Sequence, residues 1–545
     1  MKTTVQKKRS FIIAVICLIA MVSGCAAPRE TAAPANVPTT RPADAGKGYS
    51  LPLTTTGETL SICGPLDRAD TSEDPLPAIL AKVTEETGVK IEWEVIKSDF
   101  YPTMQARLAA GAKLPDIINV PAGNMDVHRY IDAGLFQAID EAIFDYAPNI
   151  EQMFSLRPDL LKMTTYADGK LYILPNNIQG WEAGKNSNDF VNPVALLYRE
   201  DLLEKTGLKV PETIDEIYTV LSAFKQLDPK YIPLSFPAGM YGSWNGPAFF
   251  SGSFGLHLMY NRFYPDDNDV IKFEMITPEF KEYTETMSRW YIEEIIDNGT
   301  AGGDAAKVQS QILNGITTMV VTNLGNIAGA YAGLEEGWLN LLPYPKGPGG
   351  KNVYLGLPAY NGMTAITKDC QNLKLALQYL DYAYFSEISR IRYVFGIEGE
   401  SYEMVDGMPR YKEDWISQFV DTTPWAALYA MNAFTSTMPA TLMREYRKIQ
   451  YEYTFRGNEH LFDLALKYAD IIVPQLPAFI LSGDEASLYT RRYPDIDTYV
   501  NEMYIKFIMG TEPFTNFDAY VNTVNSMGID EVIGVIQNAY DRYNK

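Results

Sequence analysis

Histidine and cysteine are scarce in this sequence, with only 3 His and 4 Cys among 545 residues. His128, His257 and His460 form neither a His-Glu-x-x-His pair nor another cluster typical of zinc ligands. The sequence also lacks a Gly-x-Ser-x-Gly nucleophile elbow. Its one glycine-rich stretch ending in lysine, residues 347–351, has neither the spacing nor the Ser or Thr of a phosphate-binding loop. These absences exclude the recognisable motifs of zinc and serine hydrolases.

Basic residues are few as well. The 46 Lys and Arg face 68 Asp and Glu, which gives a formal net charge of −22. Nucleic-acid-binding proteins normally show the opposite balance, so we expect no nucleic-acid partner. With 46% hydrophobic and 21% charged residues the composition is globular, and the length predicts two or more folding units.

Long hydrophobic runs are limited to the N-terminus, where Phe11 to Val22 follows a basic stretch that ends at Arg9. This run is shorter than the roughly 20 residues that span a bilayer, and its layout predicts a signal peptide over residues 1–24. Val22 to Cys25 resembles the bacterial lipobox, which predicts lipidation of Cys25 and a membrane anchor on the extracellular face. A conventional secretory signal is the alternative.

Cleavage before Cys25 removes four of the 46 basic residues and no acidic one, leaving a net charge of −26. Residues 25–50 are rich in Ala, Pro and Thr and predict an extended tether. Cys63 and Cys370 remain in the folded part, and the sequence leaves open whether they form a disulfide or two buried thiols.

Beyond the tether, short apolar strands alternate with amphipathic helices, which predicts a doubly wound α/β arrangement with a buried parallel strand at 116–120. The expected strands are 58–63, 90–96, 116–120 and 194–199, and the expected helices are 75–87, 101–110, 214–227, 278–296 and 373–385.

Several blocks, taken in order, resemble the extracellular solute-binding lipoproteins of carbohydrate ABC importers, in the large Gram-positive subfamily related to oligosaccharide- and alginate-binding proteins. These blocks are 114–118, 130–136, 167–175, 198–203 with 206–208 and 211–213, 395–403 and 529–543. Independent physical features agree with them: Asp168 and Gly169 form a turn signal, and Thr213 is placed to cap the helix that follows.

The resemblance implies a two-lobed α/β fold of the periplasmic-binding-protein (Venus flytrap) type, class II, with extra C-terminal helices. It implies an N-terminal lobe of 51–175 plus about 360–400 and a C-terminal lobe of 176–359 plus about 401–545. The hinge strands are expected near Pro175 and Gly396. We expect a monomer that binds an oligosaccharide and hands it to ABC permease subunits, with no chemical step and no cofactor.

Calcium-binding relatives carry an insertion after the helix equivalent to 214–227, but here Asp228, Pro229 and Lys230 run directly into the next strand. Three residues with one carboxylate cannot supply six to eight oxygen ligands. The acidic cluster 266–269 lacks the remaining elements of such a loop, so we expect a hairpin tip there and no metal site.

Aromatic residues make up 12% of the chain, and aromatic faces together with polar side chains are the groups that hold sugars. Trp93 and Trp290 lie within a strand and a helix pattern, so we expect them in the core. The ligand-binding candidates lie among loop-forming residues, where binding side chains concentrate: Trp181, Tyr241, Trp244 and Trp425. Glu398 is added because it is near the crossing between the lobes that the resemblance implies.

Two other functions stay open at this point. A lipid-anchored, secreted glycan-active enzyme needs a pair of carboxylates, which a sequence with 68 acidic residues neither shows nor excludes. A surface sensor module would have the same soluble domain. The acidic net charge argues against acidic sugars unless local Arg or Lys residues override it.

Overall fold

The computed structural model describes the folded chain from residue 48 onward, with several short gaps. The described residues are 48–65, 78–96, 100–120, 127–176, 178–181, 194–237, 239–240, 246–258, 262–300, 302–323, 339–356, 359–360, 362–419, 441–455, 459–468 and 471–545.

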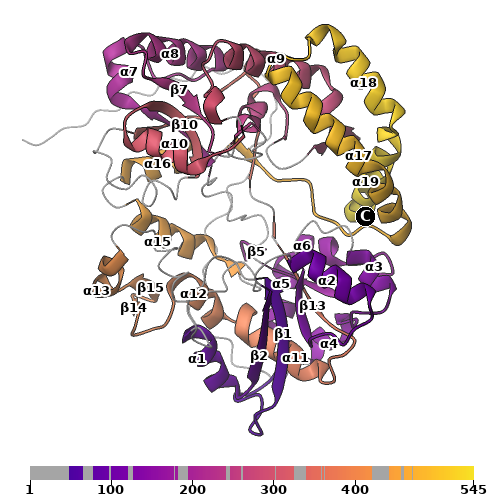
Figure 1. The fold of residues 1–545 in the computed structure, drawn as a ribbon. Helices are drawn as coiled ribbons and strands as arrows, with labels where there is room; N and C mark the ends of the chain where they lie inside the picture. Colours follow the sequence, from indigo (N-terminus) through magenta and orange to yellow (C-terminus); the bar gives the residue numbers. More distant parts are fainter. Residues whose placement is uncertain are drawn as a thin grey trace, which may run out of the picture. The chain divides into compact units, whose positions relative to one another are not determined.

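The first sheet has five strands in the order β2-β1-β3-β13-β4. β1 pairs in parallel with β2 and β3, as predicted, whereas β13 runs antiparallel to β3 and β4. Figure 1 shows β13, which comes from late in the sequence, beside the early strands. The strands are β1 Thr59–Pro65, β2 Lys90–Ile96, β3 Ile117–Val120, β4 Ile173–Pro175 and β13 Met363–Ile366.

Helices pack against this sheet and build the first hydrophobic core from its strands and their own apolar faces. They are α1 Ala78–Thr87, α2 Phe100–Ala109, α3 Val127–Asp132, α4 Asp140–Tyr146, α5 Pro148–Leu156, α6 Pro158–Thr164 and α11 Leu373–Leu380.

The second sheet has four strands in the order β11-β6-β10-β7. All six residues of β6 are buried, which is typical of a central strand covered on both faces. β6 is antiparallel to both neighbours, and β10 is parallel to β7. The strands are β6 Val194–Arg199, β7 Ile232–Ser235, β10 Thr317–Asn323 and β11 Leu339–Leu342.

A second core lies around this sheet and extends into the C-terminal helices, drawn in yellow in Figure 1. The family resemblance implied this helical extension. The helices that contribute to this core, or to a smaller hydrophobic cluster that also packs on this sheet, are α7 Glu200–Thr206, α8 Ile214–Leu227, α9 Pro278–Ile292, α10 Ala305–Leu313, α16 Glu459–Tyr468, α17 Gly483–Ile508, α18 Phe517–Ser526 and α19 Ile529–Asn544.

A smaller group of elements packs around α12 and forms a cluster of its own. It includes α12 Glu387–Phe395, α13 Glu413–Ile416, α15 Arg444–Thr454 and the hairpin of β14 Tyr402–Val405 with β15 Met408–Tyr411. The remaining strand pairs are β5 Ile178–Gln179 with β16 Thr441–Leu442, β8 Phe263–Pro265 with β9 Ile271–Phe273, and β12 Tyr354–Leu355 with β17 Ile472–Val473.

Local sequence explains where α8 begins. The Thr213 hydroxyl accepts a hydrogen bond from the Glu216 N–H, and the Glu216 carboxylate accepts one from the Thr213 N–H. This capping box satisfies backbone groups that the first helical turn leaves unpaired. The predicted cap and the predicted helix are both confirmed.

The helix expected over residues 278–296 ends at Ile292 instead. Glu294 takes a positive φ of 54°, and the chain then turns back toward the second sheet. The Leu234 N–H donates to the Ile295 carbonyl, and the Asp297 N–H donates to the Leu234 carbonyl. Pairing with the edge of β7 therefore replaces the last helical turn.

The helix expected over residues 373–385 also changes character before its end. α11 stops at Leu380, and Asp381–Phe385 forms a π-helical turn. The wider turn accompanies a buried carboxylate, because Asp381 is fully buried. Its oxygens accept hydrogen bonds from the Ile150 N–H, the Tyr49 hydroxyl and the Asn149 amide at 2.8, 2.8 and 2.6 Å. Tyr49 thereby fastens the start of the folded chain to the first core.

Within the described residues, no helix combines the length and the apolar character needed to cross a bilayer.

The buried carboxyl group predicts a pH dependence of stability. Burial raises the pKa of Asp381 to about 6, above its ordinary value. The folded protein therefore holds this proton more tightly than the unfolded chain, and the resulting stabilisation is lost as the pH rises through about 6. Relative to Asp381→Asn, we expect the wild type to lose up to about 3 kcal/mol of unfolding free energy between pH 4 and 7. Denaturant unfolding across this range measures the difference, and parallel pH profiles would contradict it.

Candidate functional site

Three strands of the first sheet end at the same edge. β1 and β3 are parallel, and β4 points the same way because β13 is antiparallel to both β3 and β4. The chain therefore leaves one edge after Pro65, Val120 and Pro175. In open α/β sheets, ligands bind outside the carboxyl ends of the strands.

A buried polar network holds this edge together. The Thr364 hydroxyl on β13 lies 2.9 Å from Asn119 Oδ1 and 2.7 Å from Asn176 Oδ1. The exposed fractions of the three side chains are 1%, 5% and 2%. Because unpaired buried polar groups are costly, these contacts fix the ends of β3 and β4 relative to each other.

The second sheet has an equivalent edge. β7 and β10 are parallel, so the chain leaves the same side after Ser235 and Asn323. After β7 the chain stays packed in the second core through Phe236 and Met240, which are 2% and 1% exposed. Tyr241 and Trp244 follow in the sequence.

Trp181 is the candidate that the structure describes most fully. It follows β5, which itself follows the carboxyl end of β4. Its side chain is 6% exposed, and the Arg390 guanidinium carbon lies 3.9 Å from its ring centroid. This distance is well within the range of a cation–π interaction. Trp181 is thus a buried stacking partner of a cation.

The backbone next to Trp181 is held by a second arginine. Arg157, at the junction of α5 and α6, donates from Nη1 to the Gly180 carbonyl. Its Nε and Nη2 donate to the two carboxylate oxygens of Asp159 at 2.9 and 2.6 Å. The Arg157 charge is therefore compensated, and this arginine acts as a clamp on the Trp181 segment.

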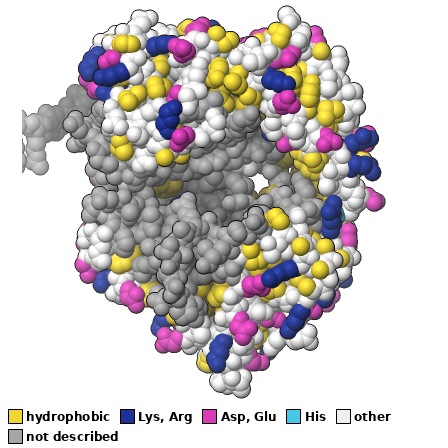
Figure 2. Space-filling model, in the orientation of Figure 1, with side chains coloured by type: hydrophobic (Ala, Val, Ile, Leu, Met, Phe, Trp, Pro, Cys, Tyr) yellow, Lys and Arg dark blue, Asp and Glu magenta, His cyan; other side chains and the backbone are white. Residues whose placement is uncertain are grey.

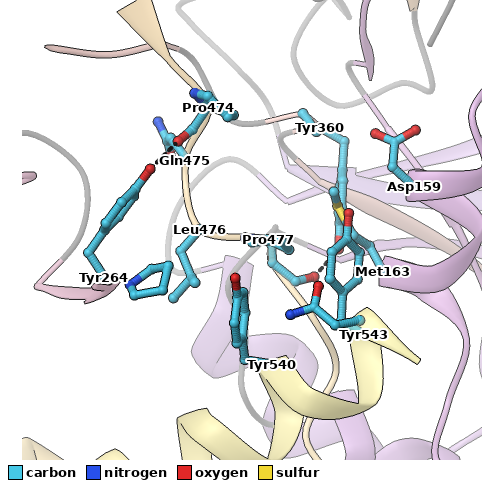
Figure 3. Close-up of a pocket in the computed structure, with 14 residues that line it drawn as sticks. Asp159, Met163, Tyr264, Tyr360, Pro474, Gln475, Leu476, Pro477, Tyr540 and Tyr543 are labelled. Atoms are coloured by element: carbon cyan, nitrogen blue, oxygen red, sulfur yellow. Dashed lines mark hydrogen bonds between the residues drawn. The ribbon is translucent and has the colours of Figure 1, made fainter. Parts of the chain in front are cut away.

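A separate pocket of about 330 Å³ lies beside residues 474–478, between α6 and the end of α19 (Figure 3). Tyrosines form much of its lining, and two of them bind the backbone of this segment. The Tyr264 hydroxyl donates to the Pro474 carbonyl at 3.2 Å, and the Tyr360 hydroxyl donates to the Ala478 carbonyl at 2.8 Å. These tyrosines hold the segment that enters α17.

Figure 2 shows how charge is distributed on one face of the molecule. Lys and Arg side chains are interspersed with Asp and Glu, and on this face the described residues form no broad area of one sign. Neither a basic stripe nor an acidic face stands out there as a docking surface for a polyion.

Of the other predicted ligand residues, the structure describes Glu398. Glu398 is exposed in the turn after α12, where the Gly399 N–H donates to the Tyr402 carbonyl at 2.8 Å. Tyr241, Trp244 and Trp425 lie outside the described residues, as does Cys25. Their roles stay predictions.

Expectations about the core are clearer. Trp290 is fully buried and packs against Phe250 with ring centroids 5.3 Å apart, so its predicted core position is confirmed. Trp93 is half-buried on β2. Cys63 and Cys370 are separate buried thiols, and burial raises the pKa of each, to about 12 and about 11.

The acidic cluster 266–269 forms the tip of the β8–β9 hairpin, as predicted. The Asp266 N–H donates to the Val270 carbonyl at 2.9 Å, and Asp269 takes a positive φ of 61°. Across the part of the chain that the structure describes, no three His, Cys, Asp or Glu side chains are grouped as metal ligands.

Sequence reasoning missed Arg390, Asn119, Asn176 and Thr364. A polar residue at the carboxyl end of a buried strand was a usable signal for the two asparagines. No feature of the neighbouring sequence distinguishes Arg390 within its helix, and only the fold brings it to Trp181.

Comparison with known proteins gives a family match and several relatives of similar length. The family profile described as bacterial extracellular solute-binding protein matches residues 69–388, which include the whole second sheet and four of the five strands of the first, all but β1. The chain is 23% identical over 531 residues to the fructooligosaccharide ABC transporter substrate-binding protein FusA of Streptococcus pneumoniae serotype 4 (strain ATCC BAA-334 / TIGR4), covering 91% of this chain and 92% of that one. It is also 23% identical to lipoprotein LipO of Bacillus subtilis (strain 168), covering 89% and 92%.

Among solved structures, the alginate-binding protein AlgQ2 without calcium ion matches with a TM-score of 0.72 and 22% identity, covering 90% of this chain and 99% of that one. This likeness over nearly the whole of both chains confirms the predicted fold class, an α/β two-lobed solute-binding-protein fold.

The polar network at the first edge generates a prediction. Thr364→Val removes the hydroxyl that joins Asn119 and Asn176, so two buried amide oxygens lose this contact. We expect a loss of about 1–3 kcal/mol of unfolding free energy. Thr364→Ser keeps the hydroxyl and should lose less. Chemical denaturation of both variants measures this, and a Val variant as stable as the wild type would show that the network is dispensable.

Proposed function

Because the chain belongs to the bacterial extracellular solute-binding proteins, we propose that it captures an oligosaccharide outside the cell and delivers it to the permease subunits of an ABC importer. The observation that carries the proposal is the family match, which includes the second sheet and all of the first sheet except β1. Each sheet ends its parallel strands at one edge. FusA, which aligns over nearly the full length, is named for fructooligosaccharide transport.

Closure of the two lobes on the ligand is the proposed mechanism, and it needs no chemical step. A ligand favours the closed state only through contacts that it makes better there. The expected hinge positions fit this mechanism: Pro175 ends β4, and Gly396 follows α12 with a φ of 89°. The proposed lobes are 51–175 with about 360–400, and 176–359 with about 401–545.

The rival functions make different demands. A glycan-active enzyme would release shortened products, whereas a binding protein returns its saccharide unchanged. FusA is named as a binding subunit, which favours the second. A surface sensor would bind sugar but would not support uptake by a permease.

The proposed location is the outer face of the cell membrane, with the lipid on Cys25 and the tether of residues 25–50 between lipid and fold. LipO, a full-length relative, is named as a lipoprotein. The hydrogen bond from Tyr49 to Asp381 gives the tether a fixed starting point on the first core.

Tryptophan substitutions test where the sugar binds. If Trp244 and Trp425 stack on sugar rings, changing either to Ala should cost about 1–4 kcal/mol of binding, or roughly tenfold to a thousandfold in affinity. The melting temperature should change little. Calorimetric titration with an oligosaccharide panel, beside thermal melts, measures both effects.

Trp290→Ala is the matched control, because Trp290 is fully buried in the second core. It should lower stability by about 3–5 kcal/mol. If the Trp244 and Trp425 variants keep their sugar affinity but melt at a much lower temperature, these tryptophans are core residues and not ligand-binding residues.

The lipid anchor is tested at Cys25. Cys25→Ala should abolish acylation and release the protein from the membrane, because two or three acyl chains supply the binding energy. Mass spectrometry of the mature wild-type N-terminus gives the direct measurement. An unmodified N-terminal residue other than Cys25 would contradict the assignment of the lipobox.

A further inference from the structure

α12 carries two arginines that are equally buried but differently paired. Arg390 and Arg392 each have 8% of their surface exposed. The Arg392 Nη1 and Nη2 atoms donate to the two carboxylate oxygens of Glu86 at 2.7 and 2.6 Å. This two-pronged contact neutralises the Arg392 charge, as a buried guanidinium normally requires.

Among the described residues, no carboxylate pairs with Arg390 in this way. Its Nη1 donates to the Phe385 carbonyl at 2.7 Å, and its Nε is buried without a hydrogen-bond acceptor. Among the residues that the structure describes, no carboxylate forms an ion pair with it. Burial lowers the pKa of Arg390 to about 10, so the side chain is still charged at neutral pH.

The Trp181 ring leaves part of Arg390 available. A ring centroid 3.9 Å from the guanidinium carbon satisfies the face of the group but accepts none of its N–H bonds in the plane. Those N–H groups form a planar fork that matches a carboxylate. Stacking therefore holds the guanidinium in place, and no carboxylate of the described residues binds its edge.

The position of the pair points to a ligand. The chain reaches Trp181 through the two-residue strand β5 from the carboxyl end of β4, the edge of the first sheet where this fold class binds its ligands. Arg157 clamps the preceding carbonyl, so Trp181 is held on both sides. A rigid cation that forms no direct ion pair with a described carboxylate is, at such an edge, suited to an anionic group of the solute.

We propose that Arg390, held on Trp181, binds a carboxylate of the solute, and that the ligand class is therefore uronate-containing oligosaccharides. This inference rests on the proposed function, since it narrows the oligosaccharide that the protein carries. The carboxylate supplies the charge that Glu86 supplies to Arg392.

Calorimetric titration of the wild type with charged and uncharged forms of the same sugars tests the class. The probes are trigalacturonate, trimannuronate and triguluronate, each beside its methyl ester, together with the neutral trisaccharide kestose. At least one acid should bind about tenfold or more tightly than its ester. Esters or kestose that bind as well as or better than every acid would overturn the inference and leave the proposed function intact. Binding of no saccharide would overturn both.

Two matched variants on α12 then assign the effect. Arg390→Met should weaken binding of the acid about tenfold or more and bring acid and ester to similar affinities. Arg392→Met should keep the ratio between acid and ester. It leaves the Glu86 carboxylate with the Tyr382 hydroxyl but without its cation, so it should lower the melting temperature. Arg390→Met should lower the melting temperature less, because it removes a buried charge that pairs with no carboxylate among the described residues.

Arg390→Lys provides a second readout if the Met variant fails to fold. It keeps the charge but loses the planar fork, so preference for the acid should fall without disappearing. An acid-to-ester ratio equal to that of the wild type in the Arg390 variants would overturn the assignment to this residue.

Discussion

The backbone pairing of β13 is the constraint on which the rest of the structure depends. β3 and β4 point the same way and do not contact each other, so their facing backbone groups need a strand between them. β13 supplies it and pairs on both sides. Buried N–H and C=O groups are paired almost without exception, so this four-residue strand cannot be omitted. It forces everything between β4 and β13 to fold as an insertion, and the second sheet is built inside that insertion.

The same constraint brings the two ends of the insertion together. The Asn176 N–H donates to the Gly362 carbonyl at 2.7 Å, directly beside the Thr364 network. Gly362 has a φ of 143°, and a Cβ atom there would lie 3.2 Å from Asn176 Cβ. The close approach of the outgoing and returning chains therefore requires glycine at this position.

Sequence patterns predicted the elements that local chemistry determines. β6 was predictable because a strand buried on both faces has a continuous apolar run, and α8 was predictable from its Thr213 cap. The ends of α9 and α11 were predicted wrongly, because residues 295–297 pair with β7 and Asp381 binds groups from distant segments. Neither partner is visible from the local sequence. β13 was not among the expected strands for the same reason: it is short and is defined by its neighbours.

The residues of the candidate site show the same difference between local and long-range determinants. Loop position predicted Trp181, but its partner Arg390 is more than two hundred positions away in the sequence, and nothing near Arg390 distinguishes it from Arg392. Only the fold shows that one arginine meets Glu86 and the other meets an indole ring. The net charge of −26 expected for the mature chain does not oppose this reading. Charges separated by more than about 10 Å in solvent are largely screened at 0.1 M salt, whereas a buried pair in contact is not. Overall acidity thus influences how fast an anionic solute approaches, while the desolvated guanidinium decides which solute stays bound. The Arg390 guanidinium is already desolvated and oriented in the free protein. The entropy cost of ordering this side chain therefore arises during folding and not when a ligand carboxylate binds.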